Sequence, residues 1–121
     1  MNKDLLNIEV QNFIKDNLNS DIPSLSLKKS AVPGISSKEL AEQVDSKKRC
    51  EHKHPLWFQT PGIYYPPKLA IEQASSELAA NYKSNLIIGE DIIDLTGGFG
   101  VDTCLFAKKA KNVTHCELNA E

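Results

Sequence analysis

The sequence predicts an α/β protein in which a helical amino-terminal region precedes one βαβ unit of an open, incomplete sheet. Apolar residues recur at helical spacing through the first half of the chain. In the second half, two short apolar runs flank a glycine-rich turn and a helical segment, a pattern typical of parallel strands joined by a crossover helix. We therefore place the helical region at residues 1–58 and the start of the α/β domain at residues 59–121.

The composition of the chain is that of an ordinary globular protein. Of its 121 residues, 40% are hydrophobic and 25% are charged, and the net charge of −2 provides no general attraction for nucleic acid. Cys50, Cys104 and Cys116 lack the spacing of a disulfide framework, and we expect the last two to be buried. The sequence shows no signal peptide and no apolar run near about 20 residues. We expect a cytoplasmic protein without a membrane span.

The first half of the chain contains several helix signals. Residues 3–19 place apolar side chains on one face of a helix, and Asn2 precedes them as a candidate cap. A short helix is expected within residues 24–31. Ser36 and Glu39 have the Ser-x-x-Glu spacing of a capping box, which predicts the start of a further helix.

In the second half, helix and strand signals alternate. A helix is predicted over residues 68–82, with Leu78 and Tyr82 on its buried face. The first strand follows, and after the glycine-rich turn comes a short helix with Cys104 on its inward side. Residues 113–118 are predicted to form the second strand, parallel to the first.

Residues 47–54 concentrate basic side chains, and four aromatic residues follow before residue 66. Basic and aromatic groups side by side suit a phosphate backbone and stacked bases. The alternative is that the lysines form a solvated helix end while the aromatic rings pack between two subdomains. Cys50, His52 and His54 are also of the residue types that bind zinc. Alternate residues of a helix point apart and no fourth ligand is evident, so we expect no metal.

The glycine-rich turn at residues 94–100 has the features of a cofactor loop. Glycines permit positive φ and close approach of the backbone to a ligand, and N–H groups that open a helix point toward the loop. A P-loop requires a lysine directly after its last glycine, but here Val101 follows Gly100, so a P-loop is not supported. A dinucleotide fingerprint needs a third glycine at Thr103, and Asp102 would repel a pyrophosphate. A cofactor without phosphates is therefore favoured.

The acidic residue that ends the first strand and the alternate glycines after it resemble motif I of the class I S-adenosylmethionine-dependent methyltransferases. Asp94, Gly98 and Gly100 match that motif, and Thr96 stands where the family usually has its first glycine. Glu117 lies 17 residues after Gly100, close to where the family places the carboxylate that binds both ribose hydroxyls. Two acceptor oxygens are suited to a vicinal diol.

A longer resemblance covers residues 65–77 and 94–102. These stretches are similar to a family of bacterial class I methyltransferases that carry a THUMP-like domain near the carboxyl terminus. The resemblance implies S-adenosylmethionine as cofactor, a Rossmann-like methyltransferase fold and structured RNA as substrate. Members of that family are several times longer. We therefore expect an amino-terminal fragment that holds part of the cofactor site, has no complete active site and is inactive alone.

The candidate cofactor residues have structural alternatives, because Asp94 can cap loop amides and Glu117 can be an exposed strand-end acid. Gln73, Ser75 and Ser76 either meet the methionine end of the cofactor or form the wet face of a helix. We assign no catalytic residue, since such enzymes work mainly by holding the methyl donor in line with the nucleophile. The predicted cofactor-binding residues are Asp94, Thr96, Gly97, Gly98, Phe99, Gly100 and Glu117.

Two other functions stay open. One is a non-enzymatic helical interaction module with a nucleotide-binding βαβ tail, and the other is an NAD-dependent oxidoreductase. A parallel sheet normally has helices on both faces and neighbours at both edges. Much of that cover is missing from this sequence, so we expect the chain to self-associate through a strand edge or apolar helix faces.

Overall fold

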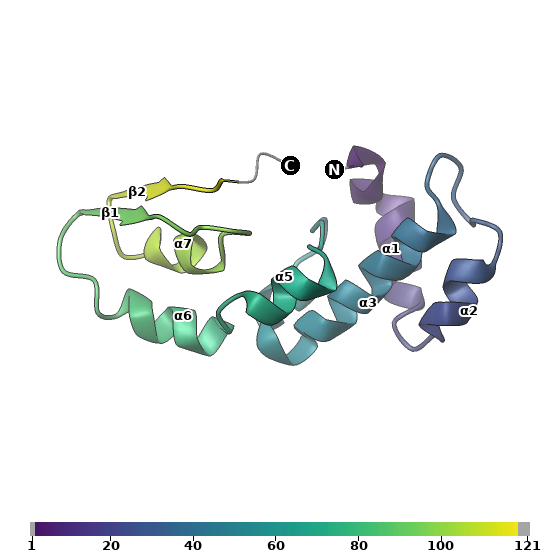
Figure 1. The fold of residues 1–121 in the computed structure, drawn as a ribbon, viewed down its shortest axis with the longest axis horizontal. Helices are drawn as coiled ribbons and strands as arrows, with labels where there is room; N and C mark the ends of the chain where they lie inside the picture. The colour runs from purple at the N-terminus through teal and green to yellow at the C-terminus, as the bar shows by residue number, and fades with distance from the viewer. Residues whose placement is uncertain (1, 119–121) are drawn as a thin grey trace. The chain divides into compact units, whose positions relative to one another are not determined.

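The computed structural model describes residues 2–118 of the chain, which divides into two compact units. The first unit extends to Ile71 and the second begins at Glu72. Helix α5, Lys68–Gln73, crosses the boundary between them (Figure 1). Residues 59–71 thus pack with the helical unit. Their assignment to the α/β domain, with a domain boundary after residue 58, stays a prediction.

The first unit opens with two short helices in place of the single predicted helix over residues 3–19. The 3₁₀ helix η1, Lys3–Leu6, is capped by the side chain of Asn2. The chain leaves helical geometry at Asn7, and helix α1 covers Ile8–Asp16. The apolar spacing continued across this break, which is why the sequence pattern did not reveal it.

Two further helices of this unit begin at well-formed caps. Helix α2 covers Ile22–Leu27, and its cap Asp21 accepts a hydrogen bond from a backbone N–H of the first turn. Helix α3 covers Ser37–Lys53. The side chain of Ser36 accepts from the Glu39 N–H at 3.2 Å, while the Glu39 carboxylate accepts from the Ser36 N–H at 2.9 Å. The predicted capping box is confirmed.

The apolar interior of the first unit forms two clusters, both of which include residues of α3. The first contains Leu5, Val10, Ile14, Leu25, Ile35, Leu40, Ala41 and Val44. The second contains Cys50, Tyr65 and Ile71, with Trp57, Phe58 and Ile63 packed against it. Trp57 and Phe58 belong to helix α4, Pro55–Gln59. Burial raises the pKa of the Cys50 thiol to about 11.

Two polar side chains of α3 hold the segment around Tyr65. The Gln43 amide accepts from the Tyr65 N–H at 2.9 Å and donates to the Tyr65 carbonyl at 2.8 Å. The Lys47 ammonium donates to the Phe58 carbonyl and to the Tyr65 hydroxyl, both at 2.9 Å. Its nitrogen also lies 5.1 and 5.0 Å from the centroids of these two rings. Burial lowers the pKa of Lys47.

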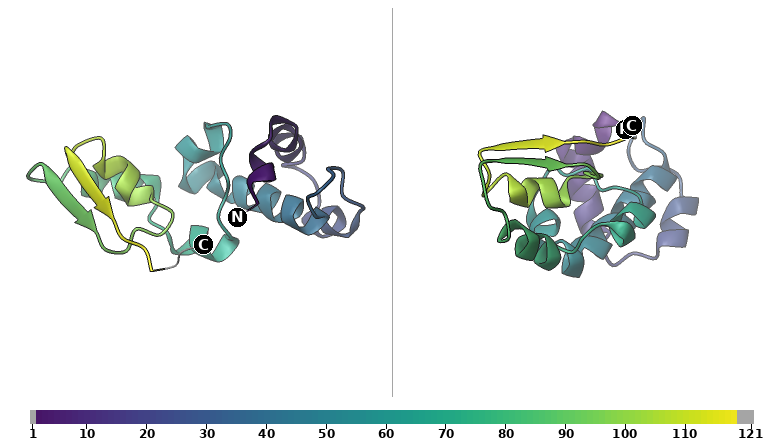
Figure 2. Two further views of the ribbon diagram at one scale, coloured as in Figure 1. Left: turned by 90° about the horizontal axis from the view of Figure 1, so that it is seen from above. Right: turned by 60° about the vertical axis from the view of Figure 1, so that its left-hand side comes forward.

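The second unit has the predicted βαβ order, and the parallel pairing of its strands is confirmed. Asp91 pairs with Asn112 and Asp94 pairs with His115. Views from two sides show α7 along one face of the sheet (Figures 1 and 2). The elements of this unit are α6 at Glu77–Ser84, β1 at Asp91–Asp94, α7 at Val101–Phe106 and β2 at Asn112–His115.

The predicted single helix over residues 68–82 is wrong. The hydroxyl of Ser76 accepts a hydrogen bond from a backbone N–H at 3.2 Å and starts α6 as a new helix. This break changes which side chains face inward. Leu78 and Tyr82 are 81% and 67% exposed, and Ala80 is buried instead.

One face of the sheet is open in the part of the chain that the structure describes. Ile92 and Asp94 are half-buried, whereas Ile93 and Leu95 are 62% and 75% exposed. Since successive strand residues point to opposite faces, α7 covers one face only. Cys104 is exposed and not buried as expected, because it lies on the outer side of α7. No helix within residues 2–118 is long and apolar enough to cross a membrane.

Candidate functional site

The loop at residues 95–100 joins the carboxyl end of β1 to the start of α7. Gly98 and Gly100 adopt left-handed backbone angles, with φ of 51° and 80°, which other residues rarely tolerate. The Gly100 N–H donates to the Gly97 carbonyl at 2.8 Å and closes the turn. A Cβ built at Gly98 would meet no atom within 4 Å. The backbone at Gly98 therefore borders open space, as a ligand-binding loop requires.

The carboxylate of Asp94 is held by its own chain. Oδ1 accepts from the Thr96 N–H at 3.2 Å, and Oδ2 accepts from the Thr103 hydroxyl at 2.7 Å. Asp94 thus ties the end of β1 to the loop and to the first turn of α7. This geometry agrees with the structural alternative for Asp94, and a direct contact with a cofactor stays a prediction.

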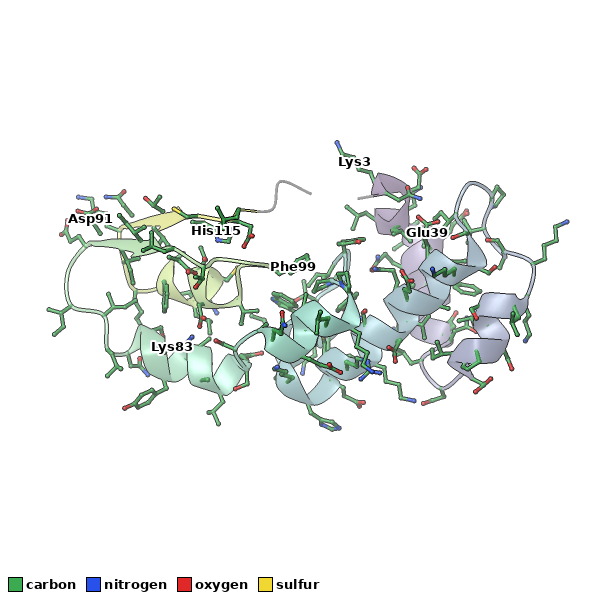
Figure 3. The ribbon with its side chains drawn as sticks, viewed as in Figure 1. Lys3, Glu39, Lys83, Asp91, Phe99 and His115 are labelled. Carbon is green, nitrogen blue, oxygen red and sulfur yellow. The ribbon has the colours of Figure 1, made fainter. Side chains whose placement is uncertain are left out.

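The structure brings Glu117 to the loop from the far end of the βαβ unit. Its Oε2 accepts a hydrogen bond from the Gly98 N–H at 2.8 Å, although the two residues are 19 positions apart. Glu117, Thr96 and Phe99 are all exposed, and Phe99 is labelled in Figure 3. The predicted loop residues and the predicted ribose ligand therefore form one cluster. The cofactor role of each residue stays a prediction.

His115 also belongs to this cluster and was not among the predicted residues. Its Nδ1 lies 2.9 Å from the Thr103 hydroxyl oxygen, and Figure 3 labels the side chain near the end of β2. The ring lies against Gly97, where an added Cβ would come within 2.1 Å of Cε1. Only the pairing of Asp94 with His115 across the sheet could have indicated this role, and that register is not visible in a single sequence.

A second polar cluster joins α7 to α6. Asp102 Oδ2 accepts hydrogen bonds from the Lys83 ammonium and from the Ser75 hydroxyl, the latter at 2.9 Å. The Lys83 ammonium also donates to the Ser75 hydroxyl at 2.7 Å. Since Lys83 balances the charge of Asp102, repulsion by Asp102 is no longer an argument against a pyrophosphate. The lack of a third glycine, at the position of Thr103, still argues against a dinucleotide site.

This cluster also bears on the residues proposed to meet the methionine end of a cofactor. Ser75 is bonded to Asp102, and Ser76 caps α6. Gln73 is exposed at the end of α5. The two serines thus have structural hydrogen bonds, and the cofactor role of all three residues stays a prediction.

Replacing Lys83 with methionine is expected to destabilise the packing of α6 on α7 by about 1 kcal/mol. Asp102 Oδ1 is buried and makes no hydrogen bond to the described residues, so the carboxylate depends on the contacts at Oδ2. The side chains of Lys83 and Asp102 are 42% and 23% exposed, which limits the loss. Native-state hydrogen exchange of the α7 amides measures this loss as a decrease in their opening free energy.

The matched control is Lys111→Met. Lys111 lies 3.4 Å from the Glu90 carboxylate, and both side chains are more than 70% exposed. Its replacement should change the opening free energy by less than about 0.3 kcal/mol. Equal protection in the two variants would contradict a role of Lys83 in balancing Asp102.

The basic run at residues 47–54 is largely bound to its own chain. Lys47 is buried, and the Lys53 ammonium donates to the Ile71 carbonyl at 2.8 Å. Arg49 forms an ion pair with Asp45 at 2.8 Å. Lys47 and Lys53 are thus bound within the first unit and do not form the solvated helix end of the structural alternative, and contact of the run with nucleic acid stays a prediction. Within the described ranges, no group of histidine, cysteine or acidic side chains could hold a metal ion.

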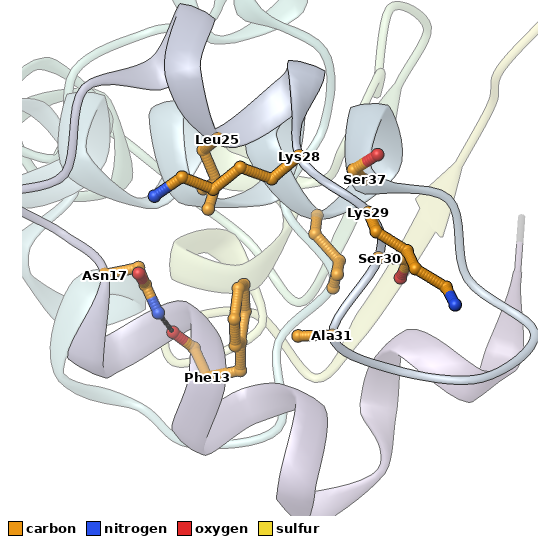
Figure 4. A pocket seen from close by; sticks show the side chains of 9 residues that line it. Phe13, Asn17, Leu25, Lys28, Lys29, Ser30, Ala31 and Ser37 are labelled. Atoms are coloured by element: carbon orange, nitrogen blue, oxygen red, sulfur yellow. Dashed lines mark hydrogen bonds between the residues drawn. The ribbon is translucent and has the colours of Figure 1, made fainter.

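A small pocket of about 160 Å³ lies in the first unit (Figure 4). Phe13, Leu25 and Leu40 contribute apolar surface, and Lys28 and Lys29 also line it. The side-chain amide of Asn17, another lining residue, donates to a backbone carbonyl of α1 at 2.8 Å. None of the predicted cofactor residues lines this pocket.

Comparison with known proteins gives one informative result. No protein-family profile matches the sequence, and no curated protein matches it either. The fold is similar to a solved structure described as "putative methyltransferase from Porphyromonas gingivalis W83", with a TM-score of 0.77 and 28% sequence identity. The match covers 93% of this chain, so it includes residues of both units. The chain spans 28% of the length of that protein.

Proposed function

We propose that this chain is part of an S-adenosylmethionine-dependent methyltransferase and that the loop at residues 95–100 binds the cofactor. The observation that carries the proposal is the carboxylate of Glu117 at the glycine loop, 2.8 Å from the Gly98 nitrogen. In open α/β sheets, ligands bind outside the carboxyl ends of the strands, where both residues lie. The similarity to the methyltransferase structure supports the same function.

In this proposal Glu117, Gly98 and Asp94 each have a distinct task. Glu117 accepts hydrogen bonds from the two ribose hydroxyls, which suits a carboxylate with two oxygens. Gly98 lets the cofactor approach the backbone closely, and Asp94 keeps the loop in shape through Thr96 and Thr103. The cofactor supplies an activated methyl group. The chain's own residues bind and orient it.

RNA is our proposed substrate for the whole protein, and it rests on the resemblance to methyltransferases with a THUMP-like domain. The basic run does not add to this support, because Lys47 and Lys53 bind carbonyl groups of the first unit. We expect the present chain to bind the cofactor weakly and to lack turnover.

The proposed function predicts that S-adenosylhomocysteine shifts the amide resonances of Gly97, Gly98 and Gly100 in a nitrogen–proton NMR titration. Glu117→Ala should weaken this binding about tenfold or more, since hydrogen bonds to a charged group are each worth about 1.5–3 kcal/mol. Glu90→Ala is the matched control. Glu90 is an exposed acid before β1 whose replacement should leave the affinity unchanged.

Three outcomes would contradict the proposal. If S-adenosylhomocysteine causes no shift and NADH shifts the same amides, the chain belongs to an oxidoreductase. If neither compound causes a shift, the interaction-module alternative is favoured. If Glu117→Ala and Glu90→Ala bind equally well, Glu117 is not the ribose ligand.

We also propose that the chain self-associates. The expected surfaces are a strand edge or apolar helix faces, and the open face of the sheet, where Ile93 and Leu95 are 62% and 75% exposed, is a further candidate. Sedimentation velocity should give a mass above that of the monomer, and Ile93→Lys should restore the monomer because it places a charge on that face. Ile88→Lys is the control, since Ile88 is fully exposed in the turn before β1. A monodisperse monomer of the unmodified chain would contradict self-association.

A further inference from the structure

We propose that His115 is a positioning residue of the cofactor loop, which it holds in its binding geometry through Thr103 and Asp94. This inference rests on the proposed function, because it concerns the affinity of the loop for the cofactor. It adds a residue that the sequence motif does not contain, and it assigns one tautomer to the neutral imidazole ring of that residue.

Hydrogen-bond chemistry fixes the direction of the chain of contacts. Asp94 Oδ2 lies 2.7 Å from the Thr103 hydroxyl, and an ionised carboxylate can only accept. The single proton of the Thr103 hydroxyl is therefore directed to Asp94. His115 Nδ1, 2.9 Å from the same hydroxyl oxygen, must then be the donor. In its neutral form, the ring of His115 thus carries its proton on Nδ1.

This chain of contacts joins the three elements that surround the loop. Asp94 ends β1, Thr103 lies in the first half of α7, and His115 ends β2. Asp94 also accepts from the Thr96 N–H inside the loop. A shift of any one element therefore changes the position of the loop relative to Glu117, two residues beyond His115.

The ring of His115 also contacts the loop directly. A Cβ built at Gly97 would lie 2.1 Å from Cε1 and 2.2 Å from Nδ1 of the ring, so the ring occupies the space that a side chain would fill. His115 is nevertheless an exposed residue. Its replacement removes little buried surface, so the effect should appear in ligand affinity and not in the stability of the unit.

The experiment compares two amide replacements in the full chain. The amide nitrogen of His115→Asn can take the place of Nδ1 and donate to Thr103, whereas that of His115→Gln lies near Nε2 and cannot. S-adenosylhomocysteine, followed by NMR titration, should bind His115→Asn within about twofold of the wild type. It should bind His115→Gln about three- to tenfold more weakly, as expected for one lost hydrogen bond, and Thr103→Val at least as weakly, because that variant loses the bonds to both Asp94 and His115. Thr103→Ser should retain wild-type affinity.

A second readout does not need the cofactor. Nitrogen-15 shifts of the neutral imidazole should show the proton on Nδ1 in the wild type and a shift toward Nε2 in Thr103→Val. Equal affinity of His115→Asn and His115→Gln, or a wild-type ring with its proton on Nε2, would overturn the inference. Absence of binding by the wild type would overturn the proposed function and, with it, any effect of His115 on affinity.

Discussion

Replacing Gly97 with alanine is expected to weaken the binding of S-adenosylhomocysteine about tenfold. The new Cβ would lie 2.1 Å from Cε1 of His115, far inside van der Waals contact, so the imidazole must leave its place. The displaced ring loses its contact with Thr103, and the loop loses its support from β2. Gly97 is therefore required by its neighbour, whereas Gly98 and Gly100 are required by their positive φ.

A double-mutant cycle isolates this clash. His115→Ala removes the ring, so adding Gly97→Ala in that background should change the affinity by less than about twofold. The four affinities are measured by the same NMR titration. If Gly97→Ala costs as much without the ring as with it, another cause, such as the backbone conformation of the loop, accounts for the loss.

Replacing Gln43 with alanine is expected to reduce the free energy of unfolding of the first unit by about 2–4 kcal/mol. The variant leaves the N–H and the carbonyl of Tyr65 without their partner, and each unsatisfied buried group costs about 1–3 kcal/mol. Urea unfolding followed by the fluorescence of Trp57, which packs against the same cluster, measures the change.

Two variants of α3 sharpen the interpretation. Glu42→Ala changes the exposed neighbouring residue and should have an effect within about 0.5 kcal/mol. Gln43→Glu preserves size but places an acceptor beside the Tyr65 carbonyl, so it should destabilise the unit at least as much as alanine does. If Gln43→Ala unfolds at the same urea concentration as Glu42→Ala, the stabilising role assigned to Gln43 is contradicted.

Much of the fold was predictable because its signals are local. The Ser36 and Glu39 capping box depends on residues three positions apart, and the parallel strands follow from two apolar runs around a helical segment. The helix breaks at Asn7 and Ser76 were missed, because apolar spacing continues through both. Once a break changes the phase of a helix, a spacing rule selects the wrong buried face, as it did for Leu78.

The polar part of the interior was harder to predict. Gln43 and Lys47 belong to residue types that are usually solvated, and only the approach of Tyr65 gives them buried partners. The same holds for Lys83, whose partner Asp102 is 19 residues away. Such contacts depend on tertiary packing, which a single sequence does not specify.

For the candidate site, the sequence indicated the loop and Glu117 but not the residues that connect them. The alternate glycines are a contiguous signal, and Glu117 follows at a fixed interval. Thr103 and His115 have their roles only because β1 and β2 pair with Asp94 opposite His115. A change of one residue in this register would turn the His115 side chain to the other face of the sheet.

The sequence separations of these contacts also have a kinetic consequence. The bonds that connect Asp94 to Thr103, Thr103 to His115 and Gly98 to Glu117 span 9, 12 and 19 residues. Short loops close at little entropic cost, and chains rich in near-neighbour contacts fold quickly. These separations are moderate, but the contacts also require β1 and β2 to pair in parallel, so we expect the glycine loop to take its final shape only after β2 and Glu117 have left the ribosome.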